Sequence, residues 1–288
     1  MTAMVVLFAQ DGAAVVAVVA AVAMVLVGHR LAAYAAVAAV LLVAHAVLSS
    51  FVVVVGHLGP VGPDLVVAVK LTGARSPVVT NVLTAVTTAG DTVGMTIFAI
   101  GVCGVLLWRR HTWAAGVMVS AVGGAGLLIV AVKNGIGRPR PPEALRMVTE
   151  TTLSFPSGHS LSSIVVLGMA TAIAAELLRR PGIATWIIVV ASFATVSIGV
   201  SRVYLGVHWT TDVLDGWLLG GAWLTVCLAA LSEVRRRDTE LCRLGRAEEP
   251  SATTVTHDGD GPLVGAALGA GRRRRHSLRS DDRAITGR

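Results

Sequence analysis

Long apolar runs alternate with short polar stretches along this 288-residue chain. Each run approaches the roughly 20 residues that an α-helix needs to cross a bilayer. The runs lie at about Met4–Gly28, Leu31–Val55, Thr92–Trp108, Thr112–Val132, Leu161–Leu178, Ile183–Val203 and Val213–Ser232. This pattern predicts an all-α fold, a polytopic bundle of membrane helices.

The first apolar run is the least regular, because Asp11 interrupts it. A short span, an interfacial segment and an uncleaved signal anchor all fit it. No small-residue cleavage site follows, which favours a retained span. We therefore expect residues 1–30 to form an extra N-terminal segment beside a membrane core at residues 31–232.

The connection His57–Asp91 is too polar to span, since it contains Asp64, Lys70 and Arg75 with several Gly and Pro. Within it, Pro63–Lys70 fits a short helix along the membrane interface. A plain connector and a substrate-guiding segment are equally consistent with this composition.

Beyond Ser232 the apolar periodicity ends and Gly, Ser, Thr, Asp and Arg predominate. This composition predicts that residues 233–288 form a disordered basic tail. For its run Arg272–Arg275, a solvated charge run is favoured over binding to anionic headgroups.

Composition excludes an ordinary soluble protein, because 54% of residues are hydrophobic and 14% are charged. The net charge is +7, but twelve of the 24 Lys and Arg follow Val234, which favours membrane orientation over nucleic-acid binding. Cys103 and Cys227 lie in apolar runs and Cys242 in the tail, without CxxC spacing. Neither a zinc site nor a disulfide framework is expected.

Short arginine groups predict the orientation of the spans. They fall on one side if the spans alternate, and that side should be cytoplasmic. These groups are Arg30, Arg109–Arg110, Arg179–Arg180 and Arg235–Arg237. The opposite, extracytoplasmic side then carries three polar clusters: Lys133-x6-Arg140-Pro141, Pro156-Ser157-Gly158-His159 and Ser201-Arg202-x5-His208-x3-Asp212.

The basic residues of these clusters point to a bound anion. A single charge at a helix end often only extends its side chain to the interface. This explanation is weaker for a group of four basic residues on the extracytoplasmic side, where few Lys and Arg are expected. The four are Lys133, Arg138, Arg140 and Arg202. Arginine matches phosphate oxygens with two parallel donors, and lysine adds a point charge.

The remaining cluster residues suit phosphate chemistry. Ser157 or Ser160 fits a helix N-cap, and a helix N-terminus presents free N–H groups to an anion, which Gly158 lets approach closely. His159 stands beside this turn. His208 and Asp212 are four residues apart, so on a helix they share a face, and Asp212 can orient His208 as a nucleophile.

Taken together, the clusters resemble the type-2 phosphatidic acid phosphatase superfamily, also called lipid phosphate phosphatases. Its pattern is K-x6-R-P, P-S-G-H and S-R-x5-H-x3-D, and all three parts match without a gap, within about Leu31 to Ser232. The resemblance implies a six-helix core and phosphate-ester hydrolysis through a phosphohistidine, with no metal ion or other cofactor. Vanadium haloperoxidases share the fold but are soluble, so the spans argue against that activity.

The resemblance also implies a role for each matched residue. His208 would be the nucleophile, Asp212 its orienting partner and His159 the general acid. The phosphoryl oxygens would be bound by Lys133, Arg140, Ser157, Gly158 and Arg202. Asp215 is less typical of the family; it would pair with a basic neighbour or lie near the positive end of the helix, without a catalytic role.

Substrate and acceptor remain open at this point. The expected partners are membrane lipids and a lipid-phosphate substrate, such as an isoprenoid diphosphate or phosphatidic acid. The Ala-, Val- and Arg-rich composition is typical of a high-GC bacterium, where undecaprenyl diphosphate recycling is a plausible task. Transfer to an alcohol or lipid acceptor needs the same site. A non-enzymatic anion or lipid transporter does not require two histidines with Asp212.

Overall fold

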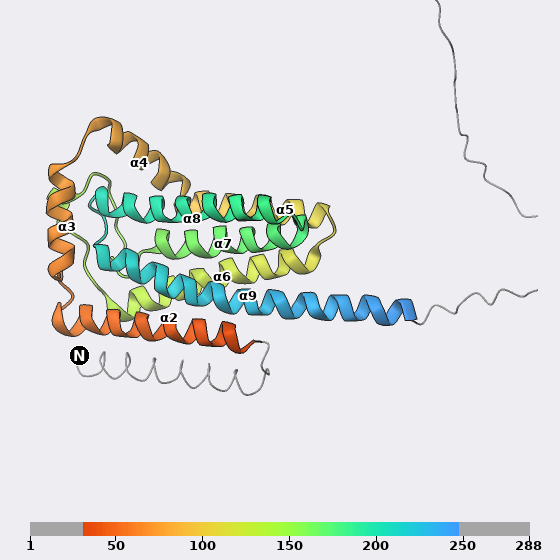
Figure 1. Cartoon of the computed structure of the whole chain (residues 1–288). Coiled ribbons are helices and arrows are strands. Elements are labelled where there is room, and N and C mark those ends of the chain that lie inside the picture. Colours follow the sequence, from red (N-terminus) through yellow and green to blue (C-terminus); the bar gives the residue numbers. More distant parts are fainter. Residues whose placement is uncertain (1–30, 248–288) are drawn as a thin grey trace, which may run out of the picture. The chain divides into compact units, whose positions relative to one another are not determined.

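The computed structural model describes residues 31–247. Within that range it contains helices and connecting segments and no strand, which confirms the all-α prediction (Figure 1). The elements are α2 (Ala32–Ser50), the π-helical turn η1 (Phe51–Val55), α3 (Gly62–Gly73), α4 (Pro77–Ala89), α5 (Thr92–Trp108), α6 (Thr112–Ile136), the 3₁₀ turn η2 (Glu143–Leu145), α7 (Gly158–Leu178), α8 (Pro181–Tyr204) and α9 (Thr210–Ala247). The predicted span Met4–Gly28 and the tail from residue 248 lie outside the described residues.

Five of the described helical segments are long and apolar enough to cross a membrane. A sixth results if α4 and α5, which meet at an angle of 51°, count as one broken span. The described residues thus contain five or six candidate spans, which confirms the predicted bundle of membrane helices. The outward faces carry large apolar side chains, as expected against lipid, including Val40, Val119, Leu127, Trp186 and Phe193.

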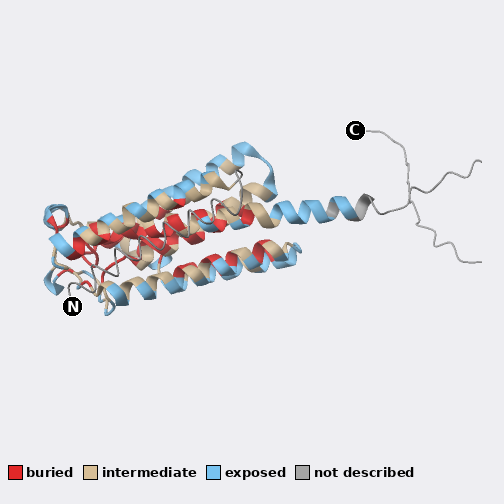
Figure 2. Cartoon of the chain, turned by 90° about the horizontal axis from the view of Figure 1, so that it is seen from below, coloured by how far each residue is buried: buried red, intermediate tan, exposed pale blue. Residues whose placement is uncertain are grey.

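The core lies where α7 packs against α5, α6 and α8, and buried residues gather on the facing sides of these helices (Figure 2). Glycines let α9 approach its neighbours closely. A Cβ on Gly124 of α6 would lie 2.1 Å from the Trp223 ring, and one on Gly168 of α7 would lie 2.4 Å from Leu224. Close packing through small residues is typical of membrane helices.

The connection His57–Asp91 is more than a plain connector. The predicted helix Pro63–Lys70 is part of α3, and α4 packs along α8. Arg75, between the two helices, donates to the carbonyls of Leu145 (2.7 Å) and Tyr204 (3.0 Å). Through Arg75, the connection therefore holds the ends of η2 and α8 in place.

Helix α9 extends past Ser232, where the sequence predicted a disordered tail to begin. Ion pairs three and four residues apart stabilise this extension, because Glu233 pairs with Arg236 and Arg237, and Arg236 also pairs with Glu240. Residues 233–247 are thus helical.

Candidate active site

Two tight turns bring the three polar clusters to the same end of the bundle. Helix α6 ends at Gly137, whose φ is +72°, and the chain then runs without an α-helix to the start of α7 at Gly158. Helix α8 reaches α9 through Gly206, also at φ +72°. A Cβ there would lie 2.0 Å from the Leu145 carbonyl oxygen, so Gly206 is required by both conformation and space.

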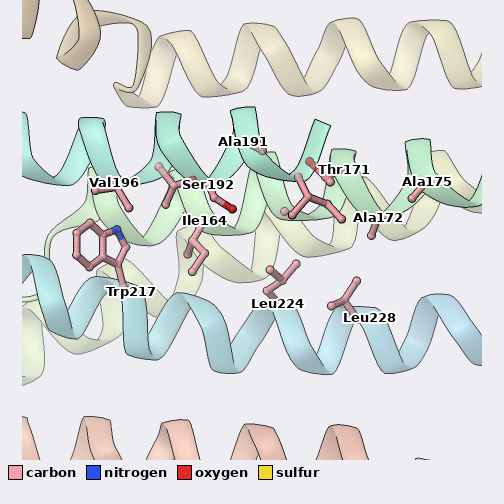
Figure 3. Close-up of a pocket in the computed structure, with 13 residues that line it drawn as sticks. Ile164, Thr171, Ala172, Ala175, Ala191, Ser192, Val196, Trp217, Leu224 and Leu228 are labelled. Carbon is pink, nitrogen blue, oxygen red and sulfur yellow. The ribbon is translucent and has the colours of Figure 1, made fainter. Parts of the chain in front are cut away.

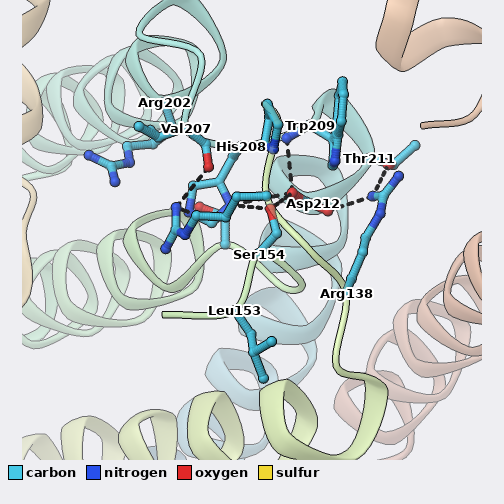
Figure 4. Close-up of polar contacts among 12 residues, drawn as sticks. Arg138, Leu153, Ser154, Arg202, Val207, His208, Trp209, Thr211 and Asp212 are labelled. Atoms are coloured by element: carbon cyan, nitrogen blue, oxygen red, sulfur yellow. Dashed lines mark hydrogen bonds and ion pairs between the residues drawn. The ribbon is translucent and has the colours of Figure 1, made fainter. Parts of the chain in front are cut away.

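His208 and Asp212 form the buried centre of the site (Figure 4). His208 Nδ1 lies 3.4 Å from Asp212 Oδ2, which also accepts from the Trp209 N–H (2.9 Å) and the Ser154 hydroxyl (2.5 Å). Arg138 Nη1 donates to the other carboxylate oxygen, Oδ1, at 2.5 Å. Because an ionised carboxylate only accepts, it favours the proton on Nδ1 and leaves the lone pair on Nε2.

The free nitrogen of His208 faces the basic side chains. Its Nε2 lies 3.2 Å from Arg140 Nη1, which can only donate. Burial, and then the charges of Arg140 and Arg202, lower the pKa of His208 well below its ordinary value. The imidazole is therefore neutral at physiological pH, as a nucleophile must be.

Main-chain carbonyls hold Lys133 and Arg140 in place. Lys133 Nζ donates to the Leu153 carbonyl at 2.7 Å and to the Thr152 hydroxyl at 3.2 Å. Arg140 donates to the carbonyls of Thr152 (2.6 Å) and Val207 (2.7 Å). Burial lowers the pKa of Arg140 to about 10, so it stays charged at neutral pH. Both cations are thus positioned mainly by neutral acceptors.

The third cation, Arg202, comes from the last turn of α8. It donates to the Thr87 hydroxyl of α4 at 2.8 Å and forms a close ion pair with Glu150. Glu150 also lies 3.5 Å from Arg140. One carboxylate therefore joins two of the three predicted phosphate-binding cations.

The Ser-Gly-His turn begins α7 as predicted. Ser157 is the N-cap, and its hydroxyl accepts from the Ser160 N–H at 3.4 Å. The Ser157 N–H donates to the Asp212 main-chain carbonyl at 2.9 Å, which ties this turn to α9. Gly158 and the half-buried His159 form the first helical turn. The helix N-terminus, with its positive dipole end, thus lies beside the His208–Asp212 pair.

Arg138, which the sequence grouped with the anion-binding cations, instead supports Asp212, a role that the sequence did not predict. Its side chain is fully buried between Asp212 (2.5 Å) and Asp64 of α3 (2.8 Å). Thr211 joins the same network, because its N–H and hydroxyl both donate to Asp64, at 2.9 and 3.0 Å. The sequence offered one signal for this network. Asp64 precedes a run of apolar residues, and a carboxylate that is buried there needs a partner.

Asp215 has a structural partner. It is buried on α9 and lies 2.8 Å from His45 Nδ1 of α2. Of the two positions that the sequence left open for this acid, the structure shows the pair with a basic neighbour, and the pair joins the first described span to the helix that carries Asp212.

A separate apolar cavity of about 520 Å³ lies among α7, α8 and α9 (Figure 3). Trp217, Ile164 and Leu224 line it, and none of the predicted site residues does. Its walls suit hydrocarbon rather than a charged group.

Comparison with known proteins agrees with this geometry. The PAP2 superfamily model matches residues 112–236. Phosphatidylglycerophosphatase B of Bacillus subtilis is 34% identical over 150 residues, which cover 51% of this chain and 72% of the relative. This chain belongs to the PAP2 superfamily.

Other relatives extend this assignment. A crystal structure of a transmembrane PAP2-type phosphatidylglycerolphosphate phosphatase from B. subtilis superposes with a TM-score of 0.62 at 26% identity, covering 68% of this chain and 96% of that one. The undecaprenyl-diphosphatase of Sulfolobus acidocaldarius is 43% identical over 75 residues, 26% of this chain and 32% of the relative. The predicted family and the phosphatase class are confirmed, and the protein is a multi-pass PAP2 membrane phosphatase.

The buried network predicts a specific pattern of stability. Arg138→Met leaves Asp64 and Asp212 buried without their shared cation, which we expect to cost about 3–5 kcal/mol, as when one partner of a buried ion pair is removed, and most of the activity. Asp64→Ala keeps the pair of Arg138 with Asp212 and should cost less, about 1–3 kcal/mol for the lost hydrogen bonds. Thermal unfolding in detergent and phosphate release measure the two effects. A loss of stability in Asp64→Ala as large as that in Arg138→Met, or full activity of Arg138→Met, would contradict the network.

Proposed function

We propose that this PAP2 enzyme hydrolyses the terminal phosphate of a lipid phosphate or isoprenoid diphosphate through a phosphohistidine on His208. The observation that carries the proposal is that the two nitrogens of the His208 imidazole have different partners. Nδ1 faces the Asp212 carboxylate at 3.4 Å, while Nε2 faces the cationic side of the site, 3.2 Å from Arg140. A nucleophile needs this arrangement of one oriented nitrogen and one free nitrogen.

In the first step, the His208 Nε2 lone pair attacks phosphorus in line. The N–P bond forms as the bond from phosphorus to the leaving oxygen breaks. His159, at the start of α7, gives a proton to that oxygen, which leaves as the lipid alcohol or as a lipid monophosphate. Lys133, Arg140 and Arg202 stabilise the charge on the equatorial oxygens, together with the N-terminus of α7 at Ser157 and Gly158.

In the second step, water attacks the phosphohistidine. His159, now neutral, takes a proton from the water, the P–N bond breaks, and Nε2 regains its lone pair. The positive charge on the imidazole during both steps is balanced by Asp212, which Arg138 and Ser154 hold in place. The side chains already supply three cations around the phosphate, so the proposed mechanism uses no metal ion.

The named relatives support a lipid as the carrier of the phosphate. They include a phosphatidylglycerophosphatase and an undecaprenyl-diphosphatase, and both names imply substrates that end in a phosphate on a long apolar molecule. The apolar spans support the same substrate class for this chain. Recycling of an undecaprenyl-type lipid carrier fits this chemistry.

We also propose that the site faces away from the cytoplasm and that the C-terminal tail lies inside. The arginine pairs at Arg109–Arg110 and Arg179–Arg180 lie at the opposite ends of α6 and α7 from the site, which supports this orientation.

Loss of the nucleophile should abolish turnover. His208→Ala is expected to reduce phosphate release from a detergent-solubilised lipid phosphate by about 10³-fold or more, since triad-type residues act as a unit. His111→Ala, which changes a histidine at the other end of α6, serves as the matched control and should retain activity. Wild-type turnover should persist in EDTA. Activity that EDTA abolishes and Mg²⁺ restores would refute the metal-free mechanism.

Cysteine labelling tests the proposed orientation. In a variant with Cys103, Cys227 and Cys242 changed to Ala, an exposed position near the site is Thr149 and one at the other end is Arg180. Thr149→Cys should react with a membrane-impermeant maleimide on intact cells, and Arg180→Cys only after the cells are opened. The reverse pattern would show that the site faces the cytoplasm.

A further inference from the structure

Glu150 places a carboxylate inside the cation cluster of the site. It comes from the segment between α6 and α7, forms a close ion pair with Arg202 and lies 3.5 Å from Arg140. The two arginine side chains are almost completely buried, at 4% and 2% exposure, whereas 25% of the Glu150 side chain is exposed. The carboxylate thus reaches inward from the edge of the site.

Charge balance explains why this contact forms. Arg140 and Arg202 are like charges in a poorly solvated site, and together with Lys133 they repel one another. Burial alone would raise the pKa of Glu150, but Arg202 and Arg140 hold it below its ordinary value. Glu150 is therefore anionic at neutral pH and compensates two arginines at once.

The same donors are needed for a phosphate. Arg140 Nη1 lies 3.2 Å from His208 Nε2, and Arg140 Nη2 lies 3.5 Å from the Glu150 carboxylate. A phosphoryl group bound at Nε2 would therefore contact the same guanidinium as Glu150. Two anions sharing that guanidinium repel each other. Phosphate binding and the Glu150 contact with the arginines therefore oppose each other.

We propose that Glu150 is an internal anion that occupies the arginine pair while the site is empty, and that it restricts the site to doubly charged phosphate groups. The proposal rests on the proposed function, because it concerns the phosphate-binding residues of that reaction. Glu150 is a specificity-determining residue in this account and takes no part in bond making or breaking.

The difference in charge between lipid headgroups supplies the selectivity. A phosphate monoester carries about −1.5 to −2 at pH 7. Ordinary phospholipids are phosphodiesters with a single negative charge on phosphorus. A dianion gains more from the two arginines than a monoanion and displaces the carboxylate toward solvent. A monoanionic phosphodiester does not, so the abundant bilayer lipids are excluded by competition.

The experiment compares wild type with Glu150→Gln, which removes the charge and keeps the shape. Glu143→Gln is the matched control, because Glu143 is an exposed acid of the same segment. Binding of inorganic phosphate is measured in detergent from its effect on the unfolding temperature. Inhibition of lipid-phosphate hydrolysis is measured with short-chain phosphatidylglycerol, which is a phosphodiester.

We expect Glu150→Gln to bind inorganic phosphate about tenfold more tightly than wild type, a gain of about 1.4 kcal/mol. The KM for lipid phosphate should fall by a similar factor. Short-chain phosphatidylglycerol should become a competitive inhibitor of this variant and remain a poor one of wild type and of Glu143→Gln. Glu150→Asp keeps the charge but reaches the arginines less well, so its affinity for phosphate should lie between those of wild type and Glu150→Gln.

Two results would overturn the proposal. One is unchanged or weaker phosphate binding by Glu150→Gln, which would make Glu150 a support for the arginines. The other is phosphodiester inhibition equal in all variants. If Glu150→Gln does not fold, a tighter affinity for phosphate in Glu150→Asp, whose shorter side chain reaches the arginines less well, decides the same point. If wild type did not hydrolyse any lipid phosphate, the proposed function would be refuted. The competition between phosphate and Glu150 could still be measured, because phosphate binding needs no turnover.

Discussion

The buried bridge from Asp64 through Arg138 to Asp212 is the constraint on which the site depends. Arg138 has no exposed surface, and its two carboxylate partners come from α3 and α9. Removing such a charge from water is costly unless every partner is in place. The network therefore fixes α3, the segment after α6 and the start of α9 relative to one another, and Asp212 can face His208 only when all three are correctly packed.

The cations of the site are arranged on a different principle. Lys133 and Arg140 donate chiefly to main-chain carbonyls, which hold their positions without neutralising them. Their charge stays available to an anion, and little reorganisation is needed when one binds. Glu150 is the exception, since it pairs with the arginines from a partly exposed position. The site thus combines a hydrogen-bonded network of buried charges that holds Asp212 with a group of three cations, Lys133, Arg140 and Arg202, that only one carboxylate among the described residues, Glu150, neutralises in part.

The sequence was sufficient for five of the described spans and for the three clusters, because hydropathy and fixed spacing are local properties. His208 and Asp212 are four residues apart, His208 just before α9 and Asp212 in its first turn, so their pairing is local. Arg138 and Asp64 are 74 residues apart, and their pairing depends on how α3 packs, which no local pattern encodes. Glu150 lies in a segment without periodicity. The extension of α9 depends on charge pairs such as Glu233–Arg236, which composition alone presented as a disordered tail.

The central claim is that His208 becomes covalently phosphorylated. Rapid acid-free quenching of the enzyme with radiolabelled lipid phosphate, followed by proteolysis and mass spectrometry, tests it most directly. The account predicts an acid-labile, alkali-stable phosphoryl group on the peptide containing His208, formed and lost at rates that match turnover. A phosphoryl group on another residue would contradict the account, and so would product formation with no labelled protein at any quench time.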